Sequence, residues 1–294
     1  MDTQISQTAF FKSRSLAGRL SASFQFMNKN FSLLLKLSSF ILLPMAVLSA
    51  LYMAVYPSNS TFVGVSVVQT IAFALVGIVC FVSFFLFNSF LYSVIQKYAE
   101  LGVVPNLTLK NMKLLLITNA KKLLLIWLVF AALFILYGAL VCGLAYLSLY
   151  TLLLTIPLFF FLIMPLSYTN FIYLYEGTSI VASFKKSFKL GLPSWGSIFV
   201  IVLLMGCLAA LFQLIVSLPW MSLMMAASFA NVSMLQGDVV SLPGYFGVLV
   251  FFLSFISVLL SSLSSIIVTI PMAFQYASVE ASRREREQEE TQSL

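Results

Sequence analysis

The sequence predicts an all-α protein: a polytopic membrane bundle of six transmembrane helices, with three amphipathic helices in the membrane interface. Of its 294 residues, 61% are hydrophobic and 9% are charged, whereas soluble domains average about 45–50% apolar and about 25% charged residues. A bilayer core roughly 30 Å thick needs about 20 apolar residues per helix. Uncharged stretches of that length recur along the chain, and the short alternating segments of a transmembrane barrel do not.

The basic residues predict the topology. All 16 Lys and Arg residues fall within residues 12–36, 97–122, 185–189 and 283–286, between the uncharged stretches. Lys and Arg beside membrane spans are retained in the cytoplasm. Six spans with both termini inside place every cluster there, whereas a shift by one span exports a whole cluster, at about 2.5–3.5 kcal/mol for each cation stranded in the bilayer.

The spans follow in chain order. Residues 123–175 carry no charge and are too long for one helix, so we expect a hairpin that turns near residues 146–150. Residues 57–60 are expected to form the first outer turn, and Asp238 to lie in an outer segment before the last span. The expected spans are residues 37–56, 67–95, two within 123–175, 198–218 and 245–275.

Apolar residues at helical spacing among basic residues predict three interfacial helices, near residues 16–31, 109–116 and 180–188. Thr178 or Ser179 is expected to cap the third. An interfacial helix followed by two spans then occurs three times, which suggests a three-fold repeat. The alternative is that these segments are solvated connecting helices packed on the bundle.

These patterns divide the chain into three regions. Residues 1–36 form a cytoplasmic N-terminal amphipathic helix, 37–279 the six-span membrane domain, and 280–294 a charged cytoplasmic tail. The tail lacks an apolar face, so we expect a fraying helix end or disorder. Because the basic residues lie beside spans, membrane topology accounts for them and we expect no nucleic-acid partner.

The sequence gives no sign of catalysis. There is no histidine, which removes the commonest metal ligand and proton shuttle. The expected spans contain no ionisable Asp, Glu, Lys or Arg, and Cys80, Cys142 and Cys207 lack metal-ligand spacing. We therefore expect no enzyme activity, no catalytic residue, no metal and no cofactor.

Two sets of residues are candidates for binding. Lysines on the cytoplasmic side are candidates for lipid headgroups, and uncharged polar residues in the inner halves of the second, fourth and sixth spans are candidates for a small pocket. The alternative for the second set is hydrogen bonding between helices. The first set is Lys121, Lys122, Lys185, Lys186 and Lys189, and the second is Asn88, Tyr168, Asn170 and Gln275.

Residues 176–195 carry a recognisable pattern: Glu176-Gly177, then Ser187 after two lysines, then Gly191 and Trp195. The pattern resembles the segment between the fourth and fifth spans of the membrane domain attached to some glycerophosphoryl diester phosphodiesterases, and of related six-helix bacterial membrane proteins. In those enzymes a separate soluble domain with histidines carries the activity. The resemblance therefore implies only the membrane module. It departs from the family in having lysines where arginines are usual.

We therefore expect a non-enzymatic protein of the bacterial plasma (inner) membrane. Its basic cytoplasmic face is expected to engage anionic membrane lipids or another membrane protein. The alternative is a channel or carrier for a lipid-like or uncharged solute that uses the intramembrane polar residues.

Overall fold

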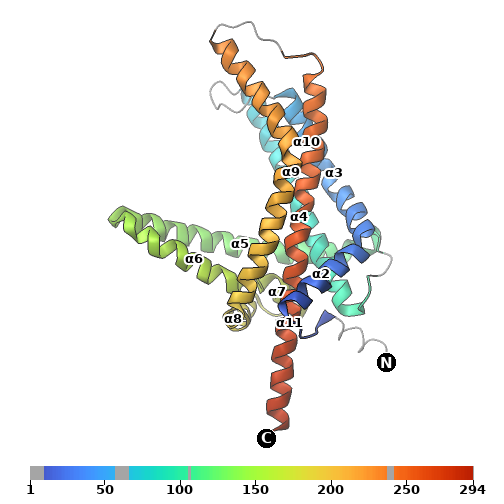
Figure 1. Ribbon diagram of the computed structural model, residues 1–294, viewed down its shortest axis with the longest axis vertical. Helices are drawn as coiled ribbons and strands as arrows, with labels where there is room; N and C mark the ends of the chain where they lie inside the picture. The colour runs from blue at the N-terminus through green and yellow to red at the C-terminus, as the bar shows by residue number, and fades with distance from the viewer. Residues whose placement is uncertain (1–9, 57–65, 105–106, 237–241, 294) are drawn as a thin grey trace. The chain divides into compact units, whose positions relative to one another are not determined.

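The computed structural model describes residues 10–56, 66–104, 107–236 and 242–293, and within these ranges the chain forms helices and no strand (Figure 1). Among the described residues, six helical stretches are long and apolar enough to cross a membrane. This confirms the predicted all-α polytopic membrane fold. The stretches are Phe31–Val55, Val67–Leu101, Leu109–Leu147, Leu149–Glu176, Trp195–Met234 and Phe246–Gln292.

The chain divides into two compact units. The first comprises the described parts of residues 1–31, 89–205 and 269–294, and the second comprises those of residues 32–88 and 206–268. Four helices have residues in both units: α3 (Phe31–Val55), through its first residue alone, α4 (Val67–Leu101), α9 (Trp195–Leu235) and α11 (Ser265–Gln292). The first unit holds most of the basic residues, and the candidate site lies within it.

The second unit contains most of α3 (Phe31–Val55) and all of α10 (Phe246–Leu263). A small apolar cluster holds it together: Phe246 and Val250 of α10 pack with Ala227 of α9 and with Met53 and Ala54 of α3. Many other large apolar side chains of these helices are exposed, as expected for surfaces that face acyl chains.

In the first unit, three helices begin with the same hydroxyl cap. The Ser15 Oγ accepts a hydrogen bond from the Gly18 amide (3.2 Å) at the start of α2 (Leu16–Lys29). Thr108 and Ser179 cap α5 (Leu109–Leu147) and α8 (Ile180–Gly191) through the amide three residues ahead (3.3 Å each). Each cap satisfies an amide that has no partner within the helix. Ser179, one of the two predicted capping residues, therefore caps α8. The three-fold repeat stays a prediction.

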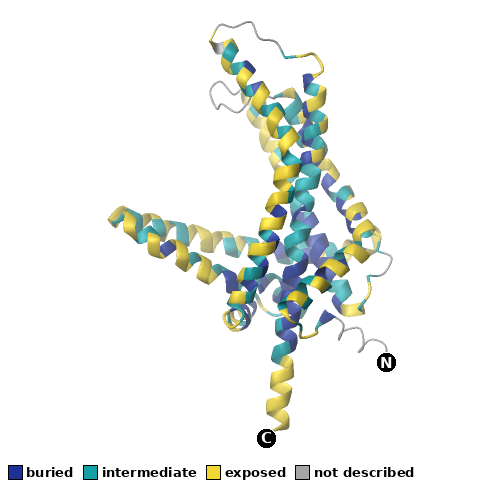
Figure 2. Ribbon diagram, viewed as in Figure 1, coloured by how far each residue is buried: buried dark blue, intermediate teal, exposed yellow. Residues whose placement is uncertain are grey.

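The hairpin turns where the sequence predicts. α5 ends at Leu147, a single 3-10 turn covers Leu149–Thr151, and α6 (Leu152–Leu166) runs back. After a short break, α7 (Thr169–Glu176) completes the fourth span. Buried residues gather in α7 and in residues 270–278 of α11, whereas the far half of the hairpin is mostly exposed (Figure 2).

Two predicted boundaries are wrong. The segment 109–116 is not a separate helix but the first part of α5, because no Gly or Pro interrupts residues 117–122. The fifth span does not stop at residue 218, since α9 continues through Pro219 to Leu235. For the charged tail, the structure has the first of the two expected states, a helix end, since α11 runs on to Gln292. The outer turn at residues 57–60 and Asp238 lie outside the described residues.

Candidate functional site

Aromatic side chains of α4, α7 and α11 meet in the first unit. Phe171 of α7 lies between Tyr92 of α4 (ring centroids 5.3 Å apart) and Tyr276 of α11 (5.6 Å, stacked). Phe274 is also buried, with Phe10 5.2 Å away. Aromatic pairs at these separations stabilise by about 0.5–1.5 kcal/mol beyond the burial of their area. They fix the positions of the polar residues next to them in sequence.

A buried hydrogen-bond network surrounds Gln275, which is fully buried. Its Nε2 donates to the Tyr168 Oη (3.0 Å) and to the Ser197 Oγ (2.6 Å). Its Oε1 accepts from Nη1 of Arg19 (2.7 Å), and the Tyr168 hydroxyl lies 3.2 Å from that of Ser194. Four segments of the chain, α2, the break before α7, the start of α9 and α11, are thereby joined.

Arg19 is a partly buried cation whose partners are all neutral. Besides Gln275, its Nε donates to the Arg14 carbonyl oxygen (2.8 Å) and to the Ser278 Oγ (3.1 Å). No described carboxylate pairs with it. Burial lowers the pKa of the guanidinium from its ordinary value, and the nearby Tyr168 acts in the opposite direction. Arginine nevertheless stays protonated in proteins, so a positive charge with no counter-ion among the described residues remains beside the network.

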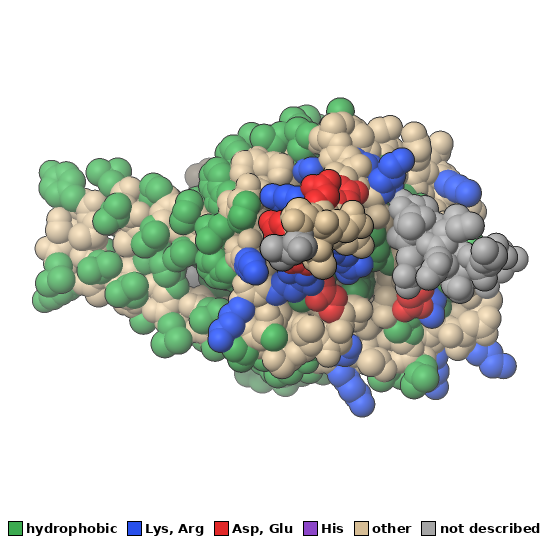
Figure 3. Space-filling view, turned by 90° about the horizontal axis from the view of Figure 1, so that it is seen from below, with side chains coloured by type: hydrophobic (Ala, Val, Ile, Leu, Met, Phe, Trp, Pro, Cys, Tyr) green, Lys and Arg blue, Asp and Glu red, His purple; other side chains and the backbone are tan. Residues whose placement is uncertain are grey.

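Arg19 lines a groove of about 600 Å³ between α2, α8, the start of α9 and α11. We call this the basic groove. The Ser194 and Ser197 hydroxyls, which belong to the Gln275 network, also line it. Basic side chains gather with acidic ones on this end of the molecule (Figure 3). The charged lining residues are Arg19, Lys189, Arg283 and Arg286, against Glu287 and Glu290.

The two other cations that come from α11 differ in their partners. Arg283 lies 3.5 Å from Glu280 and 3.6 Å from Glu287. Arg286 donates to the Ser282 carbonyl oxygen (3.2 Å), and neither Arg286 nor Lys189 forms an ion pair with a described carboxylate. The lining residues of the groove therefore carry more positive than negative charge, as suits a phosphate or carboxylate.

The five predicted headgroup lysines separate in the structure. Lys189 lines the basic groove, and Lys185 lines a different, apolar cavity. Lys122 lies over the Tyr173 ring (5.7 Å from Nζ to the centroid), and Lys121 is exposed. The arginines of the groove were not among the predicted site residues. Arg19 could have been found as a basic position of the first amphipathic helix, but Arg283 and Arg286 carry no local signal.

Lys186 instead belongs to an ion cluster. Its Nζ lies 2.6 and 2.7 Å from the Glu176 carboxylate oxygens and 3.1 Å from Oε1 of Glu280. The Tyr276 hydroxyl donates to Glu176 (2.6 Å), and Arg284 also pairs with Glu280 (3.1 Å). The Glu280 side chain is 1% exposed and those of Glu176 and Lys186 are about one-fifth exposed. The cluster is therefore largely shielded from solvent, and Lys186 holds α7, α8 and α11 together.

The remaining residues of the recognisable pattern also join helices. Gly177 has φ 65°, a left-handed conformation that ends α7 and that L side chains disfavour. The Ser187 Oγ donates to the Pro165 carbonyl oxygen (2.6 Å). A Cβ at Gly191 would lie 2.5 Å from Cα of Pro165, so glycine is needed where α8 crosses α6. The Trp195 ring lies 6.1 Å from that of Phe161.

The four residues of the predicted polar pocket do not come together in one place. Tyr168 and Gln275 share the network that borders the groove, whereas Asn170 donates to the Tyr92 Oη (3.0 Å). Asn88 belongs to the second unit and donates to the Phe84 carbonyl oxygen of its own helix (2.8 Å).

The described residues bring no three His, Cys, Asp or Glu side chains together as metal ligands, and Cys80, Cys142 and Cys207 are free thiols. That the protein needs no cofactor stays a prediction.

Fold and composition together define an integral, multi-pass membrane protein. Comparison with known proteins adds nothing more specific, because no family model, no curated protein and no solved structure matches the chain. The resemblance to the membrane domain of glycerophosphoryl diester phosphodiesterases therefore stays a prediction.

Proposed function

We propose that this membrane protein is non-enzymatic and binds the anionic headgroup of a membrane phospholipid in the basic groove. The observation that carries the proposal is Arg19, a guanidinium held in place by Gln275 and by backbone and hydroxyl acceptors, with no described carboxylate to neutralise it. Burying a charge without a counter-ion is costly. A bound phosphate lowers that cost through charge-assisted hydrogen bonds.

The rest of the groove supports a lipid as the source of the phosphate. The groove is also lined, beside its cations, by Leu16, Leu190 and Pro193. It therefore offers apolar surface to the glycerol and the first part of the acyl chain of a lipid, and charge to the headgroup. The positive-inside distribution favours the cytoplasmic side for the groove, where anionic lipids attract basic segments at about 1 kcal/mol per Lys or Arg. We place the protein in a bacterial plasma (inner) membrane with both termini in the cytoplasm.

A non-enzymatic role is favoured because the polar groups of the site bond to one another. Gln275, Tyr168 and Ser197 form one closed network, and the chain has no histidine to act as a general base. The carrier hypothesis gains no support from the amides on which it was based, since Asn170 and Gln275 belong to different networks. Another membrane protein as partner stays a hypothesis.

The test is calorimetric titration of the purified, delipidated protein with short-chain phosphatidylglycerol and short-chain phosphatidylcholine. The double variant Lys189→Gln/Arg286→Gln removes two groove cations that pair with no described carboxylate. At about 1 kcal/mol each, their loss weakens binding of the anionic lipid about 30-fold. Lys110→Gln/Lys113→Gln, at exposed positions of α5, removes the same charge and is the control.

Equal affinity of the groove variant and the control for phosphatidylglycerol contradicts the proposal. Phosphatidylcholine that binds as tightly as phosphatidylglycerol also contradicts it, because the groove then does not select an anion. Inorganic phosphate is the third ligand. If it competes as well as the short-chain lipid does, the ligand is a free phosphate rather than a lipid.

A further inference from the structure

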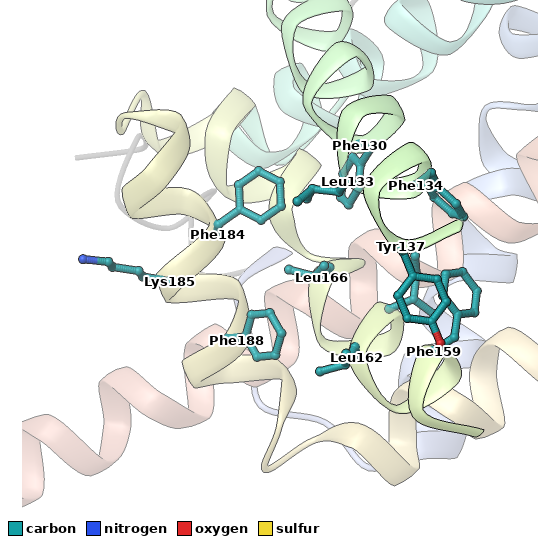
Figure 4. Close-up of a pocket in the computed structure, with 11 residues that line it drawn as sticks. Phe130, Leu133, Phe134, Tyr137, Phe159, Leu162, Leu166, Phe184, Lys185 and Phe188 are labelled. Carbon is teal, nitrogen blue, oxygen red and sulfur yellow. The ribbon is translucent and has the colours of Figure 1, made fainter. Parts of the chain in front are cut away.

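A second cavity lies between the α5–α6 hairpin and α8, within the first unit (Figure 4). Its volume is about 590 Å³. Phe184 and Phe188 of α8 point toward the hairpin, and Leu133 and Leu162 face them from α5 and α6. The basic groove is lined from the same helix by Lys189 and Leu190, so α8 contributes to both sites.

The walls of this cavity are almost wholly apolar. Its polar members are Tyr137, whose hydroxyl already donates to the Thr155 carbonyl oxygen, and Lys185. An apolar cavity gives a water molecule no partners and stays dry. Walls that face a void lose their dispersion contacts. Hydrocarbon is therefore the occupant that fits, and the membrane supplies it as acyl chains.

Lys185 indicates that the lipid whose acyl chain fills the cavity is anionic. Its stem lines the cavity, and its Nζ points away from the aromatic walls (Figure 4). Lysines at the edge of apolar surface place their stem and ammonium in this way at membrane interfaces. No described carboxylate pairs with Lys185. A lipid phosphate beside α8, outside the apolar walls, therefore complements its charge.

We propose that this cavity holds one acyl chain of an anionic phospholipid, with the lipid phosphate against Lys185. The site is distinct from the basic groove. It goes beyond headgroup binding, because apolar side chains of three helices bind the acyl chain of the lipid. The lipid is bound in a defined place rather than exchanged along the helix surfaces with the bulk membrane.

The test is photolabelling of the full chain, reconstituted in vesicles, with a phosphatidylglycerol that carries a diazirine in its acyl chain. Labelled peptides are identified by mass spectrometry. We expect label on the segments that contain Leu133, Leu162 and Phe184. Leu133→Trp fills the cavity and lowers this labelling about tenfold, the effect of displacing about two methylene groups. Leu162→Trp fills it from the opposite wall and gives the same loss.

The matched control is Leu136→Trp, on the same helix and exposed like Leu133 but outside the cavity lining, which leaves labelling unchanged. Circular dichroism confirms that each variant keeps its helix content. Label spread over exposed helix faces and insensitive to Leu133→Trp and Leu162→Trp shows annular lipid only and overturns the proposal.

Lys185→Gln tests the anionic headgroup. It is expected to lower labelling by phosphatidylglycerol about fivefold and to leave labelling by the matching phosphatidylcholine probe unchanged. Equal effects on the two probes overturn the anionic class. Lys189→Gln/Arg286→Gln, the groove variant, leaves cavity labelling at the wild-type level. A result that contradicts lipid binding in the cavity can therefore be told apart from one that contradicts lipid binding in the basic groove.

Discussion

Replacing Lys186 by Met is expected to destabilise the first unit strongly. The Nζ of Lys186 lies within 3.1 Å of both Glu176 and Glu280. Without the Lys186 ammonium, Glu280 still has two arginines beside it. Glu176 then has no described cation beside it and keeps only the hydrogen bond from the Tyr276 hydroxyl. Breaking a buried ion pair costs about 3–5 kcal/mol. Because Lys186 and Glu176 are about one-fifth exposed, we expect a loss near the lower end, about 3 kcal/mol.

The free energy of unfolding is measured by titration with sodium dodecyl sulfate in mixed micelles. The double variant Glu176→Gln/Lys186→Met removes both charges and is expected to recover more than half of the loss, because no uncompensated carboxylate remains. The control is Lys97→Met, which breaks the Lys97–Glu100 pair, whose side chains are 36% and 44% exposed. An exposed pair contributes about 0–1 kcal/mol. A Lys186→Met variant no less stable than Lys97→Met would refute the reasoning.

Three further variants test helix junctions by thermal unfolding in detergent. Gly191→Ala places a Cβ 2.5 Å from Cα of Pro165 and is expected to cost about 1–3 kcal/mol; an unchanged midpoint would mean that α8 does not cross α6 so closely. Gly177→Val forces a β-branched residue to φ 65° and costs at least about 1–2 kcal/mol, and Gly177→Asn should cost less. Gln275→Leu leaves one Arg19 donor without its acceptor and costs about 1–3 kcal/mol, so a neutral result would contradict the network.

The fold was largely predictable because its determinants are local. Span number follows from runs of apolar residues and from the cost of placing cations in hydrocarbon, and both can be read along the chain. The cap of α8 at Ser179 and the turn near residues 146–150 are equally local. The continuous helix α5 was missed because basic residues at helical spacing look the same in a separate interfacial helix and in the first turns of a span.

The site was only partly predictable because it depends on residues distant in sequence. Tyr168, Gln275 and Lys189 were candidates because they are polar or basic residues close to membrane spans. Arg19 and Gln275 are 256 positions apart in the sequence, and no periodic pattern of residues predicts the hydrogen bond between them. Arg286 lies in a charged run without an apolar face, which is typical of a disordered tail. Packing of α11 beside α2 and α8 makes that run one wall of the groove.

The basic groove is expected to open on the cytoplasmic side, and the hairpin turn is expected to lie outside. Cysteine labelling tests this directly, in a background where Cys80, Cys142 and Cys207 are replaced by Ser. Tyr146→Cys lies at the exposed hairpin turn, and Glu290→Cys lies in the groove lining. With a membrane-impermeant maleimide on sealed cells, we expect Tyr146→Cys to react and Glu290→Cys to react only after permeabilisation. Labelling of Glu290→Cys in sealed cells would contradict the account.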